Sequence, residues 1–451
     1  MKTWMNKEAS LLLITILGWS IQGLSMEKPV TVERKLGNGL NVIVREDHRA
    51  PVVVSQIWYK VGATKERRGN TGVSHALEHM MFQGTPSLPG DGFAMLISQY
   101  GGRNNAFTGD DYTAYYEELD TSNLAVSFQA ESDRMENLTL LPEAFTKEIQ
   151  VVIEERRTRT DDNPQNLTWE RFMAVANPAG PYHNPVIGWQ DDLDQMTIDD
   201  LKDWYKKWYA PNNATLVVVG DVEANKVFQL AEQYFGKIPS RELPQVKRLQ
   251  ELRPLGEKRI KVVLPAKLSY GIWGFDVPTL KNSEQESEIY ALVLASALLD
   301  GGDSARLNRS LVRGSQMAAS VGTYYDAFKP YPSQFIFTGV PSEGHTVAQL
   351  ENKIMEQVNL LKTQLVSDEE LQKAKTQLLA QEVFEKDSMS EQATLLGLLE
   401  TVGLSWKLAD QFTDKIKAVT PGQIQQVAQK YFDIKRLTVA ELIPEPTNVA
   451  K

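Results

Sequence analysis

The sequence predicts an α+β protein made of two homologous α/β domains, and two observations carry this prediction. Apolar runs typical of strands alternate with amphipathic helical stretches along the first half of the chain. In addition, the stretch 197–219 recurs as 420–442 at one constant offset and without gaps. Each copy reads as a capped amphipathic helix that leads into a strand. The length of 451 residues also exceeds what one hydrophobic core normally supports, which favours two domains.

The repeat keeps its core positions in phase. Leu201 corresponds to Ile424, and Trp208 corresponds to Tyr431, so both copies present the same apolar face. Coincidence remains an alternative, because helix-to-strand units are common. We expect a first domain at 29–238, a linker at 239–258 that contains three prolines and no apolar period, and a second domain at 259–451.

The elements of the first domain follow from periodicity and from turn residues. The two earliest apolar runs predict strands, and a paired glycine at 101–102 ends the second predicted helix. The alternation of apolar and polar residues after position 110 predicts a further strand. The strands are expected near 40–45, 52–60 and 111–118, and the helices near 73–82, 91–100, 123–138 and 143–159.

Residues 1–25 have the pattern of a secretory signal peptide. Lys2 and Lys7 precede an apolar run at 9–21, and Gly23 and Ser25 stand at the positions before a predicted cleavage site. An uncleaved membrane anchor is the alternative, although the run is short for spanning a bilayer. We therefore expect no stable membrane insertion after cleavage of this segment.

Composition excludes some classes of partner and chemistry. The formal net charge of −10 comes without a basic patch, so binding to nucleic acid is not expected. The chain has no cysteine, which excludes disulfides, thiol redox chemistry and a lipoprotein anchor.

The strongest functional signal is a His-x-x-Glu-His motif that uses two of the five histidines. On a helix, His75 and His79 lie one turn apart on the same face, and Glu78 lies close to that face. Two imidazoles and a nearby acid in this order are typical of an inverted zincin site, so we expect a zinc ion and hydrolytic chemistry. The alternative is that both histidines only pack or cap a partly buried helix.

Zinc in a catalytic site takes a third protein ligand. The helical run 147–157 offers Glu148 and Glu155, which are seven residues apart on one helix face. Spacing alone does not choose between them, and acids on such a charged helix are commonly solvated.

Segments beyond the motif resemble the pitrilysin family of zinc metallopeptidases, which includes mitochondrial processing peptidase and insulin-degrading enzyme. The similar segments are 36–44, 58–63, 75–85, 105–116 and 152–156. The resemblance implies one Zn²⁺ per chain with His75, His79 and Glu155 as ligands, Glu78 as the general base and Glu148 as a supporting acid. It also implies a mixed sheet with helices on one face in each domain, and half of a clamshell.

The resemblance further assigns a substrate-binding strand. Asn105, Ala106 and Phe107 match a family segment that lies as an edge strand beside the zinc and pairs with the backbone of an extended peptide. The equally weighted alternative is that these residues form a turn and fill a core.

The second domain has no histidine pair, and His48, His183 and His345 stand alone in expected surface loops. Some family members carry an Arg and a Tyr seven residues apart that help to bind the substrate carbonyl; here Arg313 stands at the first position, but Ser320 stands at the second. We therefore expect a heterodimer with a related zinc-free subunit that carries the Arg and Tyr, or else a homodimer. The expected function is a zinc metalloendopeptidase that acts on extended peptides, and the expected compartment is the periplasm; the alternative is a non-catalytic structural or peptide-binding subunit.

Overall fold

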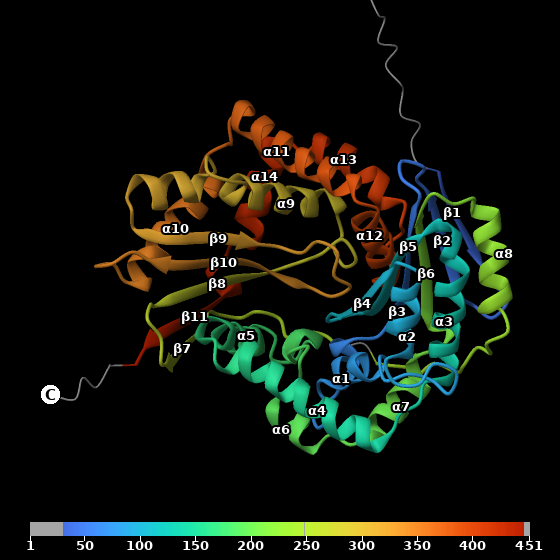
Figure 1. Cartoon of the computed structure of the whole chain (residues 1–451). Coiled ribbons are helices and arrows are strands. Elements are labelled where there is room, and N and C mark those ends of the chain that lie inside the picture. The colour runs from blue at the N-terminus through green and yellow to red at the C-terminus, as the bar shows by residue number, and fades with distance from the viewer. Residues whose placement is uncertain (1–29, 248, 446–451) are drawn as a thin grey trace, which may run out of the picture.

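The computed structural model describes residues 30–247 and 249–445, so the predicted signal segment 1–25 lies outside the described residues. Two mixed β-sheets stand side by side, each with helices packed against it (Figure 1). Within the described residues, no helix has both the length and the apolar character needed to span a bilayer.

The first sheet has six strands in the order β1-β2-β6-β3-β5-β4. The pairing of β2 with β6 is parallel, and the other pairings are antiparallel. The strands are β1 Thr31–Lys35, β2 Asn41–Glu46, β3 Val52–Tyr59, β4 Arg103–Thr108, β5 Thr113–Asp120 and β6 Ala214–Gly220. This order leaves β4 at one edge of the sheet.

The helices of the first half are α1 Val73–Met80, α2 Gly92–Gln99, α3 Leu124–Asn137, α4 Pro142–Arg156, α5 Pro164–Ala176, α6 Gln190–Gln195, α7 Ile198–Trp208 and α8 Ala224–Tyr234. The predicted helices of the first half occur close to their expected positions as α1 to α4 and α7, whereas α5, α6 and α8 were not predicted. Short helical turns connect the helices: η1 Ala63–Lys65, η2 Thr121–Asn123, η3 Arg157–Asp161, η4 Pro181–His183 and η5 Pro211–Asn213.

The second sheet repeats the plan of the first. Its order is β7-β11-β8-β10-β9, with β11 parallel to β7 and the remaining pairs antiparallel, as in β2-β6-β3-β5-β4. The strands are β7 Lys258–Leu264, β8 Tyr270–Val277, β9 Ala318–Tyr324, β10 Ser333–Pro341 and β11 Leu437–Pro444. The predicted fold class of two homologous α/β units is confirmed.

The helices of the second half are α9 Glu286–Asp300, α10 Val347–Thr363, α11 Asp368–Asp387, α12 Met389–Thr401, α13 Leu408–Ala418 and α14 Pro421–Tyr431, with turns η6 Asn308–Gly314 and η7 Ile434–Arg436. In the second half α9 follows β8 and α10 to α14 follow β10, whereas in the first half α1 and α2 follow β3 and α3 to α7 follow β5. The repeated helices α7 and α14 both begin with a capping box, at Thr197 and Thr420. Reciprocal side-chain and backbone hydrogen bonds therefore fix both helix starts in the same way.

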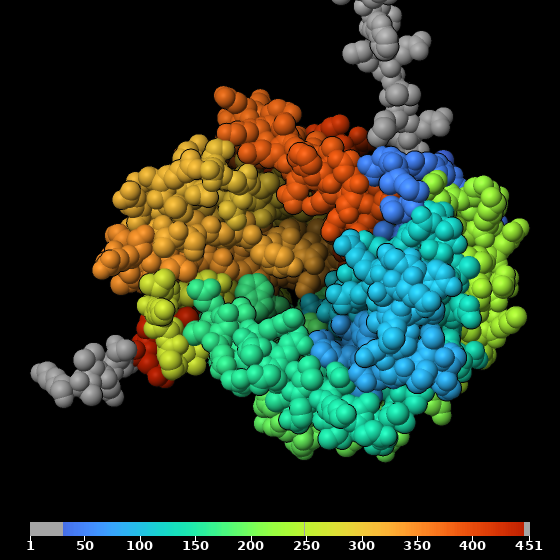
Figure 2. Space-filling view, in the orientation of Figure 1, coloured from blue at the N-terminus to red at the C-terminus, as the bar shows by residue number. Residues whose placement is uncertain are grey.

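Each half also covers the sheet of the other half. Helix α12 packs on β3 and β6, whereas α5 packs on β8 and β11 (Figure 1). Glycines permit both close approaches: a Cβ on Gly397 of α12 would lie 2.1 Å from the indole nitrogen of Trp58, and one on Gly274 of β8 would lie 2.5 Å from the ring of Phe172. The two halves therefore share two hydrophobic cores. In the space-filling view the surface is hollowed between them, beside the green segment that holds α5 (Figure 2).

Candidate metal centre

The loop before α1 fixes where the motif helix begins. Gly72 caps the helix with a φ of 84°, in the left-handed region that glycine adopts without steric cost, and a Cβ there would lie 2.6 Å from the carbonyl oxygen of Ile187. The buried carboxylate of Glu66 accepts hydrogen bonds from the backbone N–H groups of Gly72 at 2.7 Å and Ser74 at 2.8 Å. Glu66 thus supplies acceptors for the first turn, whose N–H groups have no partner within the helix.

A second buried acid anchors the same loop. Asp192 of α6 accepts hydrogen bonds from the backbone N–H groups of Gly69 at 3.1 Å and Thr71 at 3.2 Å, and from the Thr71 hydroxyl at 2.6 Å. The loop is therefore held from two sides by groups outside the motif.

Helices α1 and α4 bring three possible metal-binding groups together. Nε2 of His75 lies 3.8 Å from Oε2 of Glu155, and Nε2 of His79 lies 3.4 Å from the same oxygen. One ligand atom from each residue falls within 4.8 Å of the others. Two imidazole nitrogens and one carboxylate oxygen form a donor set that suits zinc with an open fourth position.

Glu148 takes a different place from Glu155 although both belong to α4. Its Oε2 lies 3.4 Å from Nδ1 of His79, on the ring edge opposite the cluster, and its Oε1 accepts a hydrogen bond from the Gln83 amide at 3.0 Å. A carboxylate at Nδ1 fixes the imidazole orientation and leaves Nε2 free for a metal. Glu148 therefore lies where a supporting acid would act.

Glu78 lies on α1 between His75 and His79 in sequence. Its Oε2 accepts a hydrogen bond from the Thr108 hydroxyl at the end of β4. Burial raises the pKa of Glu78 above its usual range, and the Thr108 hydrogen bond opposes this rise.

Burial also keeps one imidazole neutral. The pKa of His75 falls to about 3, first because the ring is removed from water and then because of repulsion from His79 and Arg159. A neutral imidazole is the form that binds a metal. Arg159 forms an ion pair with the other carboxylate oxygen of Glu155, which leaves one oxygen facing the histidines.

The predicted substrate segment lies on edge strand β4, which ends at the residue that contacts Glu78. Asn105 is exposed, and Ala106 packs against the main core. Phe107 packs against Trp58 with ring centroids 5.2 Å apart. Within the described residues β4 pairs only with β5, so its outer backbone edge is open.

Comparisons with known proteins identify the family. Residues 41–189 match the description insulinase (peptidase family M16), and residues 195–378 match the peptidase M16 inactive domain. The chain is 30% identical to a protein named zinc protease PqqE from Helicobacter pylori, over 97% of each chain. This chain belongs to peptidase family M16.

Solved structures of M16-like proteins share the fold. A protease from Helicobacter pylori superposes with a TM-score of 0.87 at 28% identity, covering 92% of this chain and 100% of that one. The periplasmic protease PqqL from Escherichia coli superposes with a TM-score of 0.74 at 18% identity, covering 92% of this chain but only 47% of that one. The M16 chain described here therefore has the fold of about half of the PqqL chain.

The second M16 half has a comparable helix-to-edge-strand contact without the histidine pair. In the first half Glu78 contacts Thr108 of edge strand β4; in the second half Ser296 of α9 contacts Thr323 of edge strand β9, with their hydroxyl oxygens 2.8 Å apart. If Ser296 is matched to Glu78, the positions of the two histidines are taken by Val293 and Ala297. These residues line a cavity of about 570 Å³ that lacks an imidazole.

Two further predicted positions lie away from the metal-binding cluster. Arg313 is exposed in η6 and forms an ion pair with Asp303, and Ser320 is exposed on β9. Glu66 and Asp192 were not predicted from the sequence, because both acids lie outside any motif and act only through contacts made in the folded chain.

Proposed function

We propose that this M16 protein is a zinc metalloendopeptidase that hydrolyses peptide bonds in extended peptides. The observation that carries the proposal is the convergence of His75, His79 and Glu155 within 4.8 Å, with Glu78 one helical step away and hydrogen-bonded at the end of an open edge strand. The similarity to proteins named zinc proteases supports the metal.

The donor set fits zinc in type and orientation. His75 and His79 would bind through Nε2 and Glu155 through Oε2, and Glu148 would hold the His79 ring through Nδ1. When bound, zinc supplies Lewis acidity that polarises the scissile carbonyl and makes water more acidic.

Glu78 is placed to move the proton. Its carboxylate takes a proton from the attacking water and delivers it to the leaving amine nitrogen. Thr108 restrains one carboxylate oxygen and leaves the other free for this transfer. The open edge of β4, with Asn105, Ala106 and Phe107, pairs with the peptide backbone and holds the scissile bond near Glu78.

A second chain completes the enzyme. This fold covers 47% of the PqqL chain, so that protein is about twice as long as the part that matches. In the second half of this chain Ser320 stands at the position of the family's tyrosine, and the exposed Arg313 forms an ion pair with Asp303. We propose a heterodimer with a related zinc-free subunit, with a homodimer as the second possibility, and export of the chain to the periplasm.

A non-catalytic subunit is the second candidate function, and the description of residues 195–378 as an inactive M16 domain favours it for the second half. A free acid such as Glu78 beside the cluster argues for catalysis in the first half, because a structural zinc site is closed by four protein ligands.

The test uses the chain from Met26 onward with zinc and a mixed peptide library, with cleavage read by mass spectrometry. Glu78→Gln is the matched variant, since it retains the three metal-binding groups. Cleavage by the wild type and none by the variant, with equal zinc content in both, would support a zinc endopeptidase that works without a foreign subunit. Cleavage by Glu78→Gln would reject Glu78 as the base, and inactivity of both proteins in the presence of bound zinc would point to a missing partner subunit or to the binding role.

A further inference from the structure

Helix α4 continues into a wider helical turn, η3, which carries an arginine back toward the metal-binding cluster. The backbone N–H of Asp162 donates a hydrogen bond to the carbonyl oxygen of Arg157 at 2.8 Å, as in a π-helix. Arg159 of this turn forms an ion pair with Oε1 of Glu155, four residues earlier in the chain. Local π-helical turns occur frequently at functional sites, so Arg159 is a candidate for a role in this site.

Arg159 has a single acidic partner within the part of the chain that the structure describes, and this partner is Glu155. The Arg159 side chain is 75% exposed, whereas that of Glu155 is 16% exposed. Glu170 of α5 is buried and pairs with Arg156, the last residue of α4, at 2.7 Å. The guanidinium of Arg159 is therefore held by Glu155 and otherwise lies mostly in solvent.

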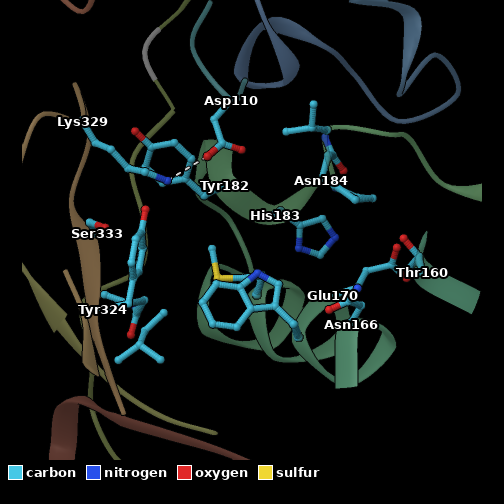
Figure 3. Close-up of a pocket in the computed structure, with 16 residues that line it drawn as sticks. Asp110, Thr160, Asn166, Glu170, Tyr182, His183, Asn184, Tyr324, Lys329 and Ser333 are labelled. Carbon is cyan, nitrogen blue, oxygen red and sulfur yellow. Dashed lines mark hydrogen bonds and ion pairs between the residues drawn. The ribbon is translucent and has the colours of Figure 1, made fainter. Parts of the chain in front are cut away.

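Another imidazole of the first half lies outside the cluster. His183 was expected in a surface loop, but it is half-buried and lines a cavity of about 500 Å³ together with Thr160, the residue after Arg159 (Figure 3). Its Nδ1 lies 3.2 Å from the carbonyl oxygens of Ala174 and Asn177. None of the three candidate metal-binding residues lines this cavity, so His183 does not complete the donor set.

The two carboxylate oxygens of Glu155 have different partners. Oε2 faces the cluster, 3.8 Å from Nε2 of His75 and 3.4 Å from Nε2 of His79, and Oε1 is engaged by Arg159. A carboxylate can bind a metal through one oxygen or through both. If Oε1 were free, it could take the fourth position that a catalytic zinc site keeps for water. The charge-assisted contact to a guanidinium opposes this change.

The positive charge of Arg159 also acts on helix α1. Burial is the main cause of the lowered pKa of His75, and the charge of Arg159 lowers it further, after that of His79. Burial raises the pKa of Glu78, and the charge of Arg159 is one of the effects that oppose this rise. The guanidinium therefore lies close to the cluster as a whole and not only to Glu155.

We propose that Arg159 is a positioning residue, which limits Glu155 to one metal-binding oxygen and so keeps the fourth zinc position open for water. The proposal rests on the zinc peptidase function proposed above. The η3 turn does not depend on the Arg159 side chain, because the backbone carbonyl oxygen of this residue accepts a hydrogen bond from the Asn166 side chain at 2.7 Å. A substitution at this position therefore tests the ion pair and leaves the turn in place.

A neutral ligand of the fourth metal position tests the proposal without turnover. The chain from Met26 onward is loaded with Co²⁺, which reports ligand binding through its visible absorption, and is titrated with imidazole. Arg159→Met removes the ion pair and keeps an unbranched side chain, and Arg159→Lys keeps the charge and one donor group. Arg157→Met is the matched control, because this exposed arginine of the same turn pairs with Glu154 and Asp162 instead.

Arg159→Met should bind imidazole at least about tenfold more weakly than the wild type, because the second oxygen of Glu155 occupies its position. Its metal affinity, measured by chelator competition, should be equal or higher, since the metal gains an oxygen ligand and loses a nearby positive charge. Arg159→Lys should restore imidazole binding at least in part, and Arg157→Met should match the wild type. Unchanged imidazole binding in Arg159→Met, a loss of metal affinity there, or the same weakening in Arg157→Met would overturn the proposal.

Peptide cleavage supplies an independent readout. In Arg159→Met kcat should fall about 10- to 100-fold with KM little changed, since water loses its position at the metal while the contacts to the peptide remain. A wild type that cleaves no peptide would bear on the peptidase proposal alone, and the imidazole titration would still decide the role of Arg159.

Discussion

Glu66 should make the stability of the protein depend on pH, although it lies outside the motif. Burial raises the pKa of Glu66 from an ordinary 4.5 to about 7, and the backbone N–H groups of Ser74 and Gly72 only partly oppose this rise. Because the folded-state pKa lies above the unfolded one, the folded protein binds the proton more tightly. The stabilising contribution is complete below about pH 4.5 and is lost as the pH rises through 7.

The size of the effect follows from the two pKa values. At about 1.4 kcal/mol for each pH unit, the difference between 4.5 and about 7 corresponds to about 3 kcal/mol, most of which is lost between pH 5 and pH 8. The variant Glu66→Gln keeps an acceptor oxygen and does not titrate. The decline in its free energy of unfolding between pH 5 and pH 8 should therefore be smaller than that of the wild type by about 2 to 3 kcal/mol.

Urea denaturation at both pH values, with a chelator present, measures this difference without a contribution from zinc binding. Other buried acids titrate equally in both proteins and cancel in the comparison. Glu66→Ala is the second control: it leaves two buried N–H groups without an acceptor and should lose about 1–3 kcal/mol for each at both pH values. Parallel pH dependences in the wild type and Glu66→Gln would refute the reasoning.

Three further outcomes follow from the structure. Glu148→Gln should weaken zinc binding by about 10- to 100-fold, measured by chelator competition, because the contact to Nδ1 of His79 loses its charge; unchanged affinity would remove Glu148 from the supporting role. Zinc at 100 times its dissociation constant should raise the free energy of unfolding by about 2.7 kcal/mol in the wild type and not in His79→Ala, as read from urea curves. Gly397→Leu should lower the free energy of unfolding by at least about 1–3 kcal/mol, because a Cβ at this position would overlap Trp58. In Gly256→Ala the added Cβ meets no neighbour, so the free energy of unfolding should change little.

Elements with strong local periodicity could be predicted from the sequence. The expected helix at 73–82 occurs as Val73–Met80, and the expected strand at 52–60 occurs as Val52–Tyr59. The histidine pair could also be predicted to share one helix face, because this depends only on 3.6 residues per turn. Its assignment as a zinc site remains a prediction.

The choice between Glu148 and Glu155 could not come from local spacing. Seven residues on a helix are about 10.5 Å along the axis, so both acids share a face but reach different points on α1. How α4 crosses α1 decides which carboxylate lies at Nε2 and which lies at Nδ1, and this crossing depends on tertiary packing. The roles of Glu66 and Asp192 could not be predicted for the same reason, since their hydrogen-bond donors lie in the loop before α1 and in its first turn and meet these acids only in the folded chain.

Helices α5 and α12 each pack on the sheet of the opposite half, so the two halves are linked more closely than two domains that only lie next to each other. Helix α12 buries Trp58, whose ring also contacts Phe107 on the edge strand beside Glu78. Helix α5 starts after the η3 turn that follows α4, crosses to the second sheet and packs in the core that the two halves share there. The three residues that could hold a metal ion all come from the first half, but the packing of its edge strand depends on α12 of the second half. A half that lacks the histidine pair therefore still supports the candidate site through its packing, which is a physical reason for the chain to retain it.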